Sequence, residues 1–367
     1  MMKRLKKPLK AAACVLLALV IAAGGYLVYV LAAYYRVEDL QEREVISNGS
    51  VSASPQAGTQ YRITSYNIGF GAYSADFSFF MDGGKESRAR SAKAVLTNIG
   101  GAVGVINEIK PDFALFQEVD TDGTRSHHVN QLFYLMDAVT NGAFPAYNAV
   151  FAQNYDSPYL FYPFTSPHGA NKSGIATFTG FRIDSAIRRQ LPIEQSLMKL
   201  VDLDRCYCVS RIPIENGKEL VLYNLHLSAY TSDGTIAVEQ LEMLLDDMNA
   251  EYESGNYCIA GGDFNKDLPG NSEVLFGIPA SESDTWAQPL PDGIIPEHLR
   301  LVVPLHEDAP AASCRTAAEP YNTETTFRVT VDGFLVSDNV SVLDSNVIDT
   351  GFAYSDHNPV YMDFMLN

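Results

Sequence analysis

The sequence predicts an α/β domain that follows a single N-terminal membrane-spanning helix. From residue 61 onward, short apolar runs with strand character alternate with longer segments in which apolar residues recur at helical spacing. Before that, residues 11–35 contain no charged side chain, which is typical of a transmembrane helix. The chain has 367 residues and is 47% hydrophobic, so it can bury a large core.

The predicted anchor is long enough to span a bilayer. At about 1.5 Å per residue, residues 11–35 form a helix about 37 Å long, and a hydrocarbon layer is about 30 Å thick. Cations precede it, which favours a cytoplasmic N-terminus and an extracytoplasmic domain, in a single-pass protein of the cell membrane. A cleaved signal peptide is the main alternative, but its apolar region spans only about 7–15 residues. We therefore expect an uncleaved anchor. The cations are Lys3, Arg4, Lys6, Lys7 and Lys10.

The domain boundaries follow from composition. Residues 1–10 form the basic cytoplasmic segment, and residues 11–35 form the anchor. Residues 36–60 are polar and contain Ser, Gly and Pro without a sustained apolar period, so they predict a linker. No second linker interrupts residues 61–367, which are expected to form one domain.

The charge balance bears on possible partners. The formal net charge is −18, from 26 Lys and Arg against 44 Asp and Glu. Proteins that grip long nucleic acids through their phosphates carry a basic surface. The balance weakens the hypothesis of a processive nuclease without excluding it, because a local basic strip could be present. The solubility of an exported domain explains the acidity by itself.

The five cysteines do not define a disulfide framework or a zinc site. Cys14 lies in the predicted span, whereas Cys206, Cys208, Cys258 and Cys314 belong to the exported part, where a disulfide could persist. Cys206 and Cys208 are two residues apart on a predicted strand, so they point to one face and are poorly placed to bond each other. No paired Cys or His cluster has zinc-ligand spacing. We expect buried free thiols or a single bridge.

Polar residues stand at the ends of the predicted strands. The strands are expected at 61–68, 112–119, 173–183, 219–227, 257–264, 329–337 and 359–366, and helices at 87–109 and 235–252. Several strand ends of a sheet can converge on one patch. Taken singly, most of these residues fit turns, solvated strand ends or a half-buried histidine. The carboxylate in the apolar "VTVDGFLV" run is different, because burial requires a partner such as a histidine. The residues are Asn67, Glu118, His226, Asp263, Asn265, Asp332, Asp356 and His357.

The motifs that carry these residues occur in a specific order. "SYNI", "FQEV", "NLHL", "GGDFN", "VDGFLVS" and "SDHNPV" together resemble the endonuclease/exonuclease/phosphatase superfamily. Its members include deoxyribonuclease I-like nucleases, sphingomyelinase-like phosphodiesterases and inositol polyphosphate phosphatases. The resemblance covers residues 61–367 and implies a four-layer α/β sandwich, two mixed sheets with helices outside, and metal-dependent phosphoester hydrolysis. The chain departs from the pattern at Gly333, where an aromatic residue or His often follows the Asp.

The resemblance also implies roles for the residues. A hard cation such as Mg²⁺, or Mn²⁺, takes oxygen ligands, so Glu118 and the amide oxygen of Asn67 are expected to hold the metal. His357 is the expected general base, oriented by Asp332. Asp356 is expected to assist a second metal or to hold the phosphate.

Three further residues are expected around the phosphate. The resemblance places His226 at the leaving-group side, and Asp263 and Asn265 beside the phosphate. Asp263 is an alternative to His357 as the general base. All the residues that the chemistry requires are present, which disfavours a non-catalytic surface binding module.

The sequence indicates the type of reaction more closely than it indicates the substrate. Residues 121–131 offer Arg125 and His128, and residues 154–174 offer aromatic side chains and Lys172. These segments are expected either to line a substrate groove or to be ordinary polar loops. The candidate substrates are a phospholipid headgroup, a small phosphodiester and extracellular nucleic acid, and no protein partner is implied.

Overall fold

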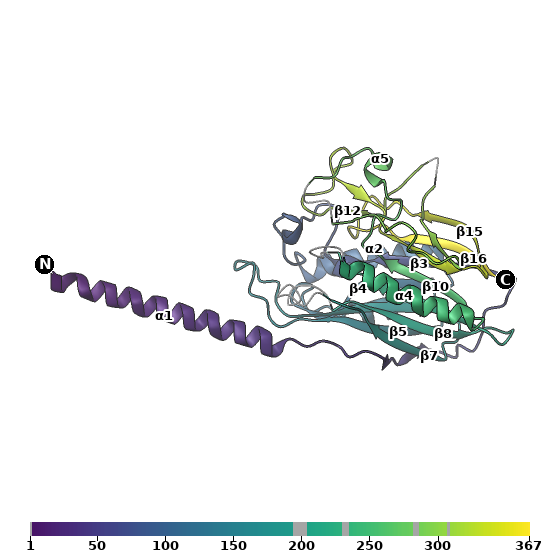
Figure 1. Ribbon diagram of the computed structural model, residues 1–367, viewed down its shortest axis with the longest axis horizontal. Coiled ribbons are helices and arrows are strands. Elements are labelled where there is room, and N and C mark those ends of the chain that lie inside the picture. Colours follow the sequence, from purple (N-terminus) through teal and green to yellow (C-terminus); the bar gives the residue numbers. More distant parts are fainter. Residues whose placement is uncertain (1, 194–203, 230–234, 282–285, 307–308) are drawn as a thin grey trace.

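A computed structural model describes residues 2–193, 204–229, 235–281, 286–306 and 309–367. Helix α1 (Met2–Ala33) extends away from the rest of the chain as a long rod (Figure 1). Its segment Pro8–Ala33 is long and apolar enough to cross a membrane, with a mean hydropathy of 2.5. Most of its side chains from residue 8 onward are exposed, as the lipid-facing side chains of a lone transmembrane helix would be.

Two mixed seven-stranded sheets form the body of the described domain. The first contains, in spatial order, β1 (Gln41–Glu42), β7 (Ser185–Gln190), β8 (Cys206–Pro213), β9 (Glu219–His226), β10 (Tyr257–Asp263), β14 (Asp332–Ser337) and β11 (Leu299–Val302). The second contains β15 (Val340–Val347), β16 (Val360–Leu366), β3 (Gln60–Asn67), β4 (Phe113–Gly123), β6 (Asn171–Thr179), β5 (Tyr147–Asp156) and β2 (Val45–Asn48). A small pair, β12 (Cys314–Arg315) and β13 (Arg328–Val329), lies outside both sheets.

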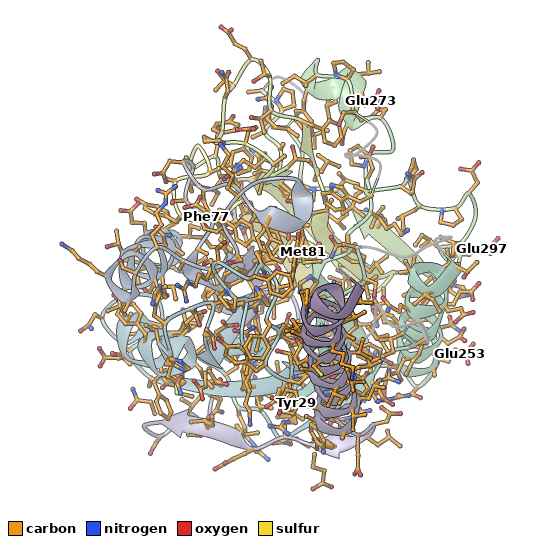
Figure 2. The ribbon with its side chains drawn as sticks, turned by 90° about the vertical axis from the view of Figure 1, so that its left-hand side faces the viewer. Tyr29, Phe77, Met81, Glu253, Glu273 and Glu297 are labelled. Carbon is orange, nitrogen blue, oxygen red and sulfur yellow. The ribbon has the colours of Figure 1, made fainter. Side chains whose placement is uncertain are left out.

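Helices cover the outer faces of the two sheets. Helices α2 (Ala92–Ile109) and α3 (Gln131–Val139) pack on the second sheet, and α4 (Thr235–Glu253) packs on the first. Figure 2, in which α1 points toward the viewer, shows Glu253 of α4 on one flank. The short elements are η1 (Gly69–Gly71), η2 (Phe80–Asp82) and α5 (Ser272–Phe276). The predicted four-layer α/β sandwich behind one apolar N-terminal helix is confirmed.

The alternation of side chains along the strands builds the core. In β4, Leu115 packs between the two sheets with Ile259 and Phe334, whereas Phe116 packs under α2 with Ile99. Successive side chains of a strand point to opposite faces, so one strand supplies two apolar layers. This explains why the predicted strands are nearly continuous apolar runs rather than half-polar ones.

Helix α2 begins later than its apolar period suggests. The Oγ of Ser91 accepts a hydrogen bond of 3.1 Å from the backbone N–H of Ala94, which makes Ser91 the N-cap. The helix ends at Ile109, and its C-cap Lys110 has a left-handed φ of 51°. The residues 87–91 that we expected in the helix therefore lie outside it.

The predicted linker differs from the structure. Within residues 36–60, β1 pairs with β7 and β2 pairs with β5, so the segment adds an edge strand to each sheet. The buried guanidinium of Arg188 also donates to the carbonyl oxygens of Val37 and Glu38. Short edge strands bond on one side only and need no apolar alternation, so composition did not reveal them. The folded unit thus begins closer to the end of α1.

All five cysteines are free. Cys206 and Cys208 both point into the layer between the two sheets, as their spacing predicts. Cys258 and Cys314 are also buried. Of the two expected alternatives, buried free thiols describe the four cysteines of the domain.

Candidate active site

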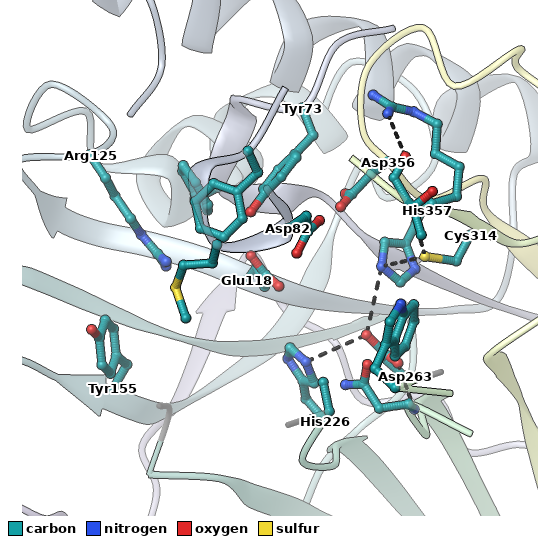
Figure 3. Close-up of a pocket in the computed structure, with 18 of the residues that line it drawn as sticks. Tyr73, Asp82, Glu118, Arg125, Tyr155, His226, Asp263, Cys314, Asp356 and His357 are labelled. Atoms are coloured by element: carbon teal, nitrogen blue, oxygen red, sulfur yellow. Dashed lines mark hydrogen bonds and ion pairs between the residues drawn. The ribbon is translucent and has the colours of Figure 1, made fainter. Parts of the chain in front are cut away.

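Three polar residues stand in one row across neighbouring strands. The parallel register of β9 and β10 sets His226 opposite Asp263, and the antiparallel register of β10 and β14 sets Asp263 opposite Asp332. The Nε2 of His226 lies 3.4 Å from Oδ2 of Asp263 (Figure 3). Gly262 has a φ of 149°, and a Cβ there would lie 2.0 Å from the carbonyl oxygen of Leu225. Only glycine therefore permits this close approach of the strands beside the row.

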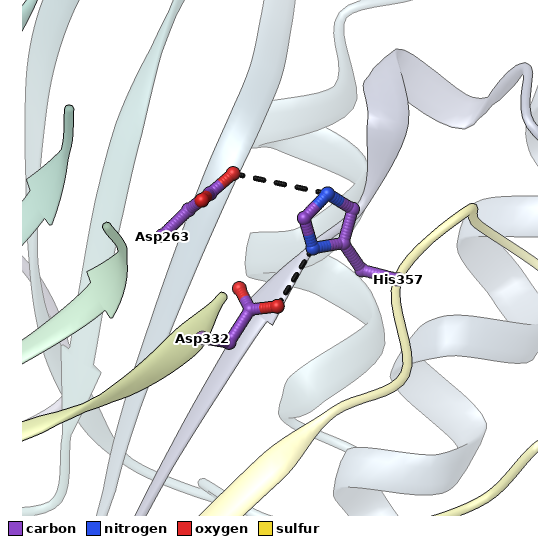
Figure 4. A group of neighbouring side chains, drawn as sticks. All are labelled: Asp263, Asp332 and His357. Atoms are coloured by element: carbon purple, nitrogen blue, oxygen red, sulfur yellow. Dashed lines mark hydrogen bonds and ion pairs between the residues drawn. The ribbon is translucent and has the colours of Figure 1, made fainter. Parts of the chain in front are cut away.

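His357 reaches this row from the other sheet. It precedes β16, and its Nδ1 lies 2.7 Å from Oδ2 of Asp332 (Figure 4). Its Nε2 lies 3.8 Å from Oδ2 of Asp263 and 3.5 Å from the sulfur of Cys314. Asp332 is fully buried, and its Oδ1 has no hydrogen-bond partner among the described residues. The histidine is thus the partner that a carboxylate in an apolar strand requires.

Glu118 sits at an irregularity in β4. The pairing of β4 with β6 shifts register between Phe116 and Val119, and Glu118 has a left-handed φ of 55°. The bulge re-aims the side chain toward the pocket, a common use of bulges next to sites. Nδ2 of Asn67 lies 3.4 Å from Oε1 of Glu118 and 3.0 Å from Oδ2 of Asp263. Asn67 therefore links Glu118 to Asp263.

Glu118, His226, Asp263 and His357 line one pocket (Figure 3). The carboxylates of Glu118, Asp82 and Asp356 gather on one side of it, and His226, Asp263 and His357 lie on the other. The remaining lining residues are Phe70, Tyr73, Phe79, Met81, Arg125, Tyr155, His168, Arg205, Ala229, Asn265, Trp286, Cys314, Arg315 and Thr316.

The sandwich resembles solved structures. The crystal structure of an endonuclease/exonuclease/phosphatase from Beutenbergia cavernae has a TM-score of 0.56 at 17% identity, covering 84% of this chain and 72% of that one. The chain has the endonuclease/exonuclease/phosphatase fold. A Leptotrichia buccalis protein of that family has a TM-score of 0.53 at 16% identity, covering 83% of this chain and 100% of that one. ANGEL2, a 2′,3′-cyclic phosphatase, has a TM-score of 0.55 at 16% identity, covering 88% and 99%. No family model and no curated protein matches the sequence.

In this endonuclease/exonuclease/phosphatase fold, burial sets the charge states of the site. Burial lowers the pKa of His226, and the nearby cations Arg205, His357 and Arg125 act in the same direction. Burial also acts to lower the pKa of His357, but the charge of Asp332 and its hydrogen bond outweigh it and raise that pKa well above the usual value. The row therefore pairs a neutral histidine with a charged one.

The buried carboxyls shift in the other direction. Burial raises the pKa of Asp263, and the neighbouring charge of Asp332 adds to the rise. Burial and then the charge of Glu118 raise the pKa of Asp356 to about 6, although His357 and Arg315 oppose the shift. A cation bound among these carboxylates would relieve their repulsion.

Most predicted site residues converge, but two differ in detail. The Oδ1 of Asn67 accepts the backbone N–H of Gly69 at 3.0 Å, so its amide nitrogen, not its oxygen, faces Glu118. Turning the amide to offer its oxygen to a metal would break that bond. Nδ2 of Asn265 donates to the carbonyl oxygen of Leu227 at 2.8 Å, and its backbone N–H donates to Oδ1 of Asp263 at 2.9 Å, so Asn265 positions the Asp263 carboxylate.

The predicted substrate contacts receive less support. Arg125 lines the pocket, but its guanidinium is buried and bonded to Asp120 through Nη2 at 2.7 Å and Nε at 3.1 Å. His128 and Lys172 are exposed, pair with Asp122 and Asp156, and are absent from the described pocket lining. The prediction of a groove rested on the polar composition of residues 121–131 and on the aromatic composition of residues 154–174.

Sequence reasoning missed several pocket residues. Asp82 lies in the single-turn helix η2, and Cys314 and Arg315 form the two-residue strand β12. Arg205 precedes β8 with a φ of 35°. Elements this short carry no periodic signal, and none of these residues belongs to the motifs of the resemblance. Only their proximity in the fold identifies them.

The donor set fits a hard divalent cation. Glu118, Asp356 and Asp82 offer carboxylate oxygens on one side of the pocket, which Mg²⁺ or Mn²⁺ prefers. Asp263, Asp332 and His357 also place one potential ligand atom each within 4.8 Å of one another. Because Nδ1 of His357 already bonds Asp332, this second group is better suited to proton transfer than to holding magnesium.

Proposed function

We propose that the chain is a membrane-anchored, extracytoplasmic, divalent-metal-dependent phosphoester hydrolase of the phosphodiesterase type. One observation carries the proposal. His226, Asp263, Asp332 and His357, drawn from both sheets, meet in one buried row beside the Glu118 carboxylate, in the fold that phosphoester hydrolases such as ANGEL2 use. The expected substrates remain a lipid headgroup, a small phosphodiester or nucleic acid.

Glu118 is the principal metal residue in this proposal. Together with Asp356 and Asp82 it would hold Mg²⁺ or Mn²⁺, which would neutralise phosphate charge and make a bound water more acidic. Asn67 would fix Glu118 and Asp263 through its amide nitrogen rather than act as a ligand. This role differs from the one expected from sequence, because the backbone N–H of Gly69 holds the amide oxygen.

The pKa directions favour Asp263 over His357 as the general base. A base must be unprotonated before it acts, and Asp332 keeps His357 in its charged form near neutral pH. Burial raises the pKa of Asp263 toward the range in which a carboxylate accepts a proton efficiently. His357 would then donate a charge-assisted hydrogen bond to a phosphoryl or leaving oxygen. His226, neutral and 3.4 Å from Asp263, would orient that carboxylate.

The test compares substrates and one matched pair of variants. The full chain in detergent is given bis-p-nitrophenyl phosphate, plasmid, single-stranded RNA, choline phospholipids and inositol phosphates, each with Mg²⁺ or Mn²⁺. His357→Ala is the blank, and His298→Ala is the control, because His298 is exposed and absent from the described pocket lining. Turnover lost only in His357→Ala supports the proposal. No turnover of any substrate would favour the binding-module alternative.

A further inference from the structure

The loop between β5 and β6 is apolar and exposed. Residues 157–167 contain no charged side chain. Phe161, Tyr162 and Phe164 in this loop are 49%, 64% and 83% exposed. A cluster of large exposed aromatic side chains in a chain with a formal charge of −18 marks a contact surface rather than ordinary soluble surface.

The same loop is bonded to the membrane helix. The hydroxyl of Tyr26 donates to the carbonyl oxygen of Tyr159 at 3.3 Å and accepts the backbone N–H of Phe161 at 3.1 Å. The hydroxyl of Tyr29 accepts the backbone N–H of Tyr159 at 3.1 Å. The rings of Tyr26 and Phe161 pack edge to face at 5.2 Å. The loop between β5 and β6 projects from the sandwich on the side of α1 (Figure 1).

These bonds fix the depth of the loop relative to a bilayer. The last cation before the span is Lys10, and about 20 residues cross the hydrocarbon layer, so the outer edge of that layer lies near Val30. Tyr26 lies four residues earlier, about 6 Å deeper for an upright helix and less for a tilted one. The bonded part of the loop, residues 159–161, therefore lies just inside the outer edge of the hydrocarbon layer, next to the interface where Tyr rings are favoured.

The backbone of the loop suits that depth. Backbone N–H and C=O groups that lack partners are costly near hydrocarbon. The tyrosine hydroxyls of α1 satisfy the N–H groups of Tyr159 and Phe161 and the carbonyl of Tyr159. Partners supplied by the anchor itself are expected of a loop that enters the interface, and a water-exposed loop would not need them.

The aromatic loop is continuous with the mouth of the pocket. Tyr162 lies 5.9 Å, ring to ring, from Phe80 of η2, and Phe80 lies 5.9 Å from the pocket residue His168. Met81, next to Phe80, lines the pocket and is 38% exposed. In Figure 2, which views the molecule from the α1 side, Met81 lies on the face turned toward the viewer.

We propose that residues 157–167, with Met81, form a membrane-contact surface that seats in the outer interface of the bilayer crossed by α1. The pocket then faces that bilayer and takes the phosphodiester of a lipid headgroup. The contact surface stands on geometry alone, whereas the lipid substrate rests on the proposed function. The formal charge of −18 opposes long polyanions and so favours lipid over nucleic acid.

Depth-dependent fluorescence quenching tests the contact surface without any activity. Phe164→Trp and the control Leu343→Trp, at an exposed position on β15, are placed in the full chain and reconstituted into phosphatidylcholine vesicles with or without acyl-chain bromines. The native Trp286 gives the same background in both and in the parent. We expect bromolipid to quench the added fluorescence of Phe164→Trp and not that of Leu343→Trp. Equal quenching of the two variants would contradict the proposed membrane-contact surface. Tyr162→Trp repeats the test at a second position.

Paired turnover assays test the substrate. Phe164→Asp and Leu343→Asp are compared in vesicles containing phosphatidylcholine, sphingomyelin and phosphatidylinositol, and on soluble bis-p-nitrophenyl phosphate. We expect Phe164→Asp to lower lipid turnover by about tenfold through misorientation, with soluble turnover unchanged. Equal loss on both substrates, or faster turnover of plasmid or RNA than of lipid by the parent, would overturn the lipid assignment. A parent inactive on every substrate would contradict the proposed function instead, and quenching would still decide the surface.

Discussion

Nδ1 of His357 lies 2.7 Å from Oδ2 of Asp332, although Asp332 begins strand β14 of one sheet and His357 lies just before strand β16 of the other. The pair therefore forms only when the two sheets pack. Because Asp332 raises the pKa of His357, the packing of the two sheets also determines the charge of His357.

Replacing Asp332 by Asn tests this pair. The neutral amide removes the charge that raises the pKa of His357, so that pKa should fall toward or below its usual value. We expect kcat to fall by about 10²–10⁴-fold, as for other oriented proton-transfer groups. NMR titration of His357 and steady-state kinetics measure the two effects. Asp338→Asn, at an exposed position just after β14, is the control. An unchanged titration of His357 would contradict the coupling.

Glu118→Gln tests the metal assignment. The variant keeps the shape of the side chain and removes its negative charge, so Mg²⁺ and Mn²⁺ should bind more weakly. We expect the rise in melting temperature on adding either cation to be lost, together with at least about 100-fold of the turnover. Asp122→Asn is the matched control, because Asp122 lies on the same strand and is exposed. Full turnover of the parent in EDTA would rule out a metal requirement.

The fold was predictable where the chain is periodic. The β3, β4, β9, β10 and β16 runs are apolar because each is covered on both faces, and their motif residues mark strand ends that converge. The site was predictable where it depends on those strands. Elements of two to four residues are too short to show a periodic pattern, so they could not be predicted in this way.

Charge and composition misled where contacts are tertiary. Arg125 lies in a polar segment that is typical of an exposed loop. Its guanidinium is nevertheless buried by Asp120 and by the ring of Phe70, whose centroid is 4.0 Å away. Residues 41–48 have the composition of a linker, yet they complete the edges of both sheets. The ring of Phe70 and the strands β7 and β5 lie far from these residues in the sequence, although beside them in the fold, so local sequence could not reveal the contacts.

The orientation of the chain in the membrane gives a third prediction. The cations before the span favour a cytoplasmic N-terminus. Protease added to intact cells should therefore digest the domain that follows residue 36, whereas a tag at the N-terminus should be cut only after the membrane is permeabilised. Immunoblotting with antibodies to each end measures both. Protection of the domain in intact cells would reverse the assigned topology.

The buried Arg125–Asp120 pair predicts a stability effect rather than a purely substrate effect. Arg125→Met would leave Asp120 buried without its cation, which costs about 3–5 kcal/mol of unfolding free energy. Arg182→Met is the matched control, because the Arg182–Asp184 pair is exposed and contributes at most about 1 kcal/mol. Denaturant unfolding in detergent measures both. Equal stability of the two variants would show that Arg125 is free to serve the substrate.

His168 predicts how stability depends on pH. Burial, with the nearby charge of Arg125, lowers the pKa of His168 to about 4, and its Nδ1 lies 2.9 Å from the carbonyl oxygen of Ser87. The unfolded chain, with a histidine pKa of about 6.5, binds more protons than the folded chain between about pH 4 and 6.5. The contribution of His168 is therefore complete above about pH 6.5 and is lost as the pH falls, by at most about 1.4 kcal/mol per unit. In His168→Asn the amide N–H can replace Nδ1–H while the titration disappears. Between pH 5 and 7, the unfolding free energies of the parent and of His168→Asn should converge as the pH falls. His298→Asn is the control, because His298 is exposed, and its unfolding free energy should change with pH as that of the parent does. A constant difference between parent and His168→Asn across that range would exclude His168 as the titrating group.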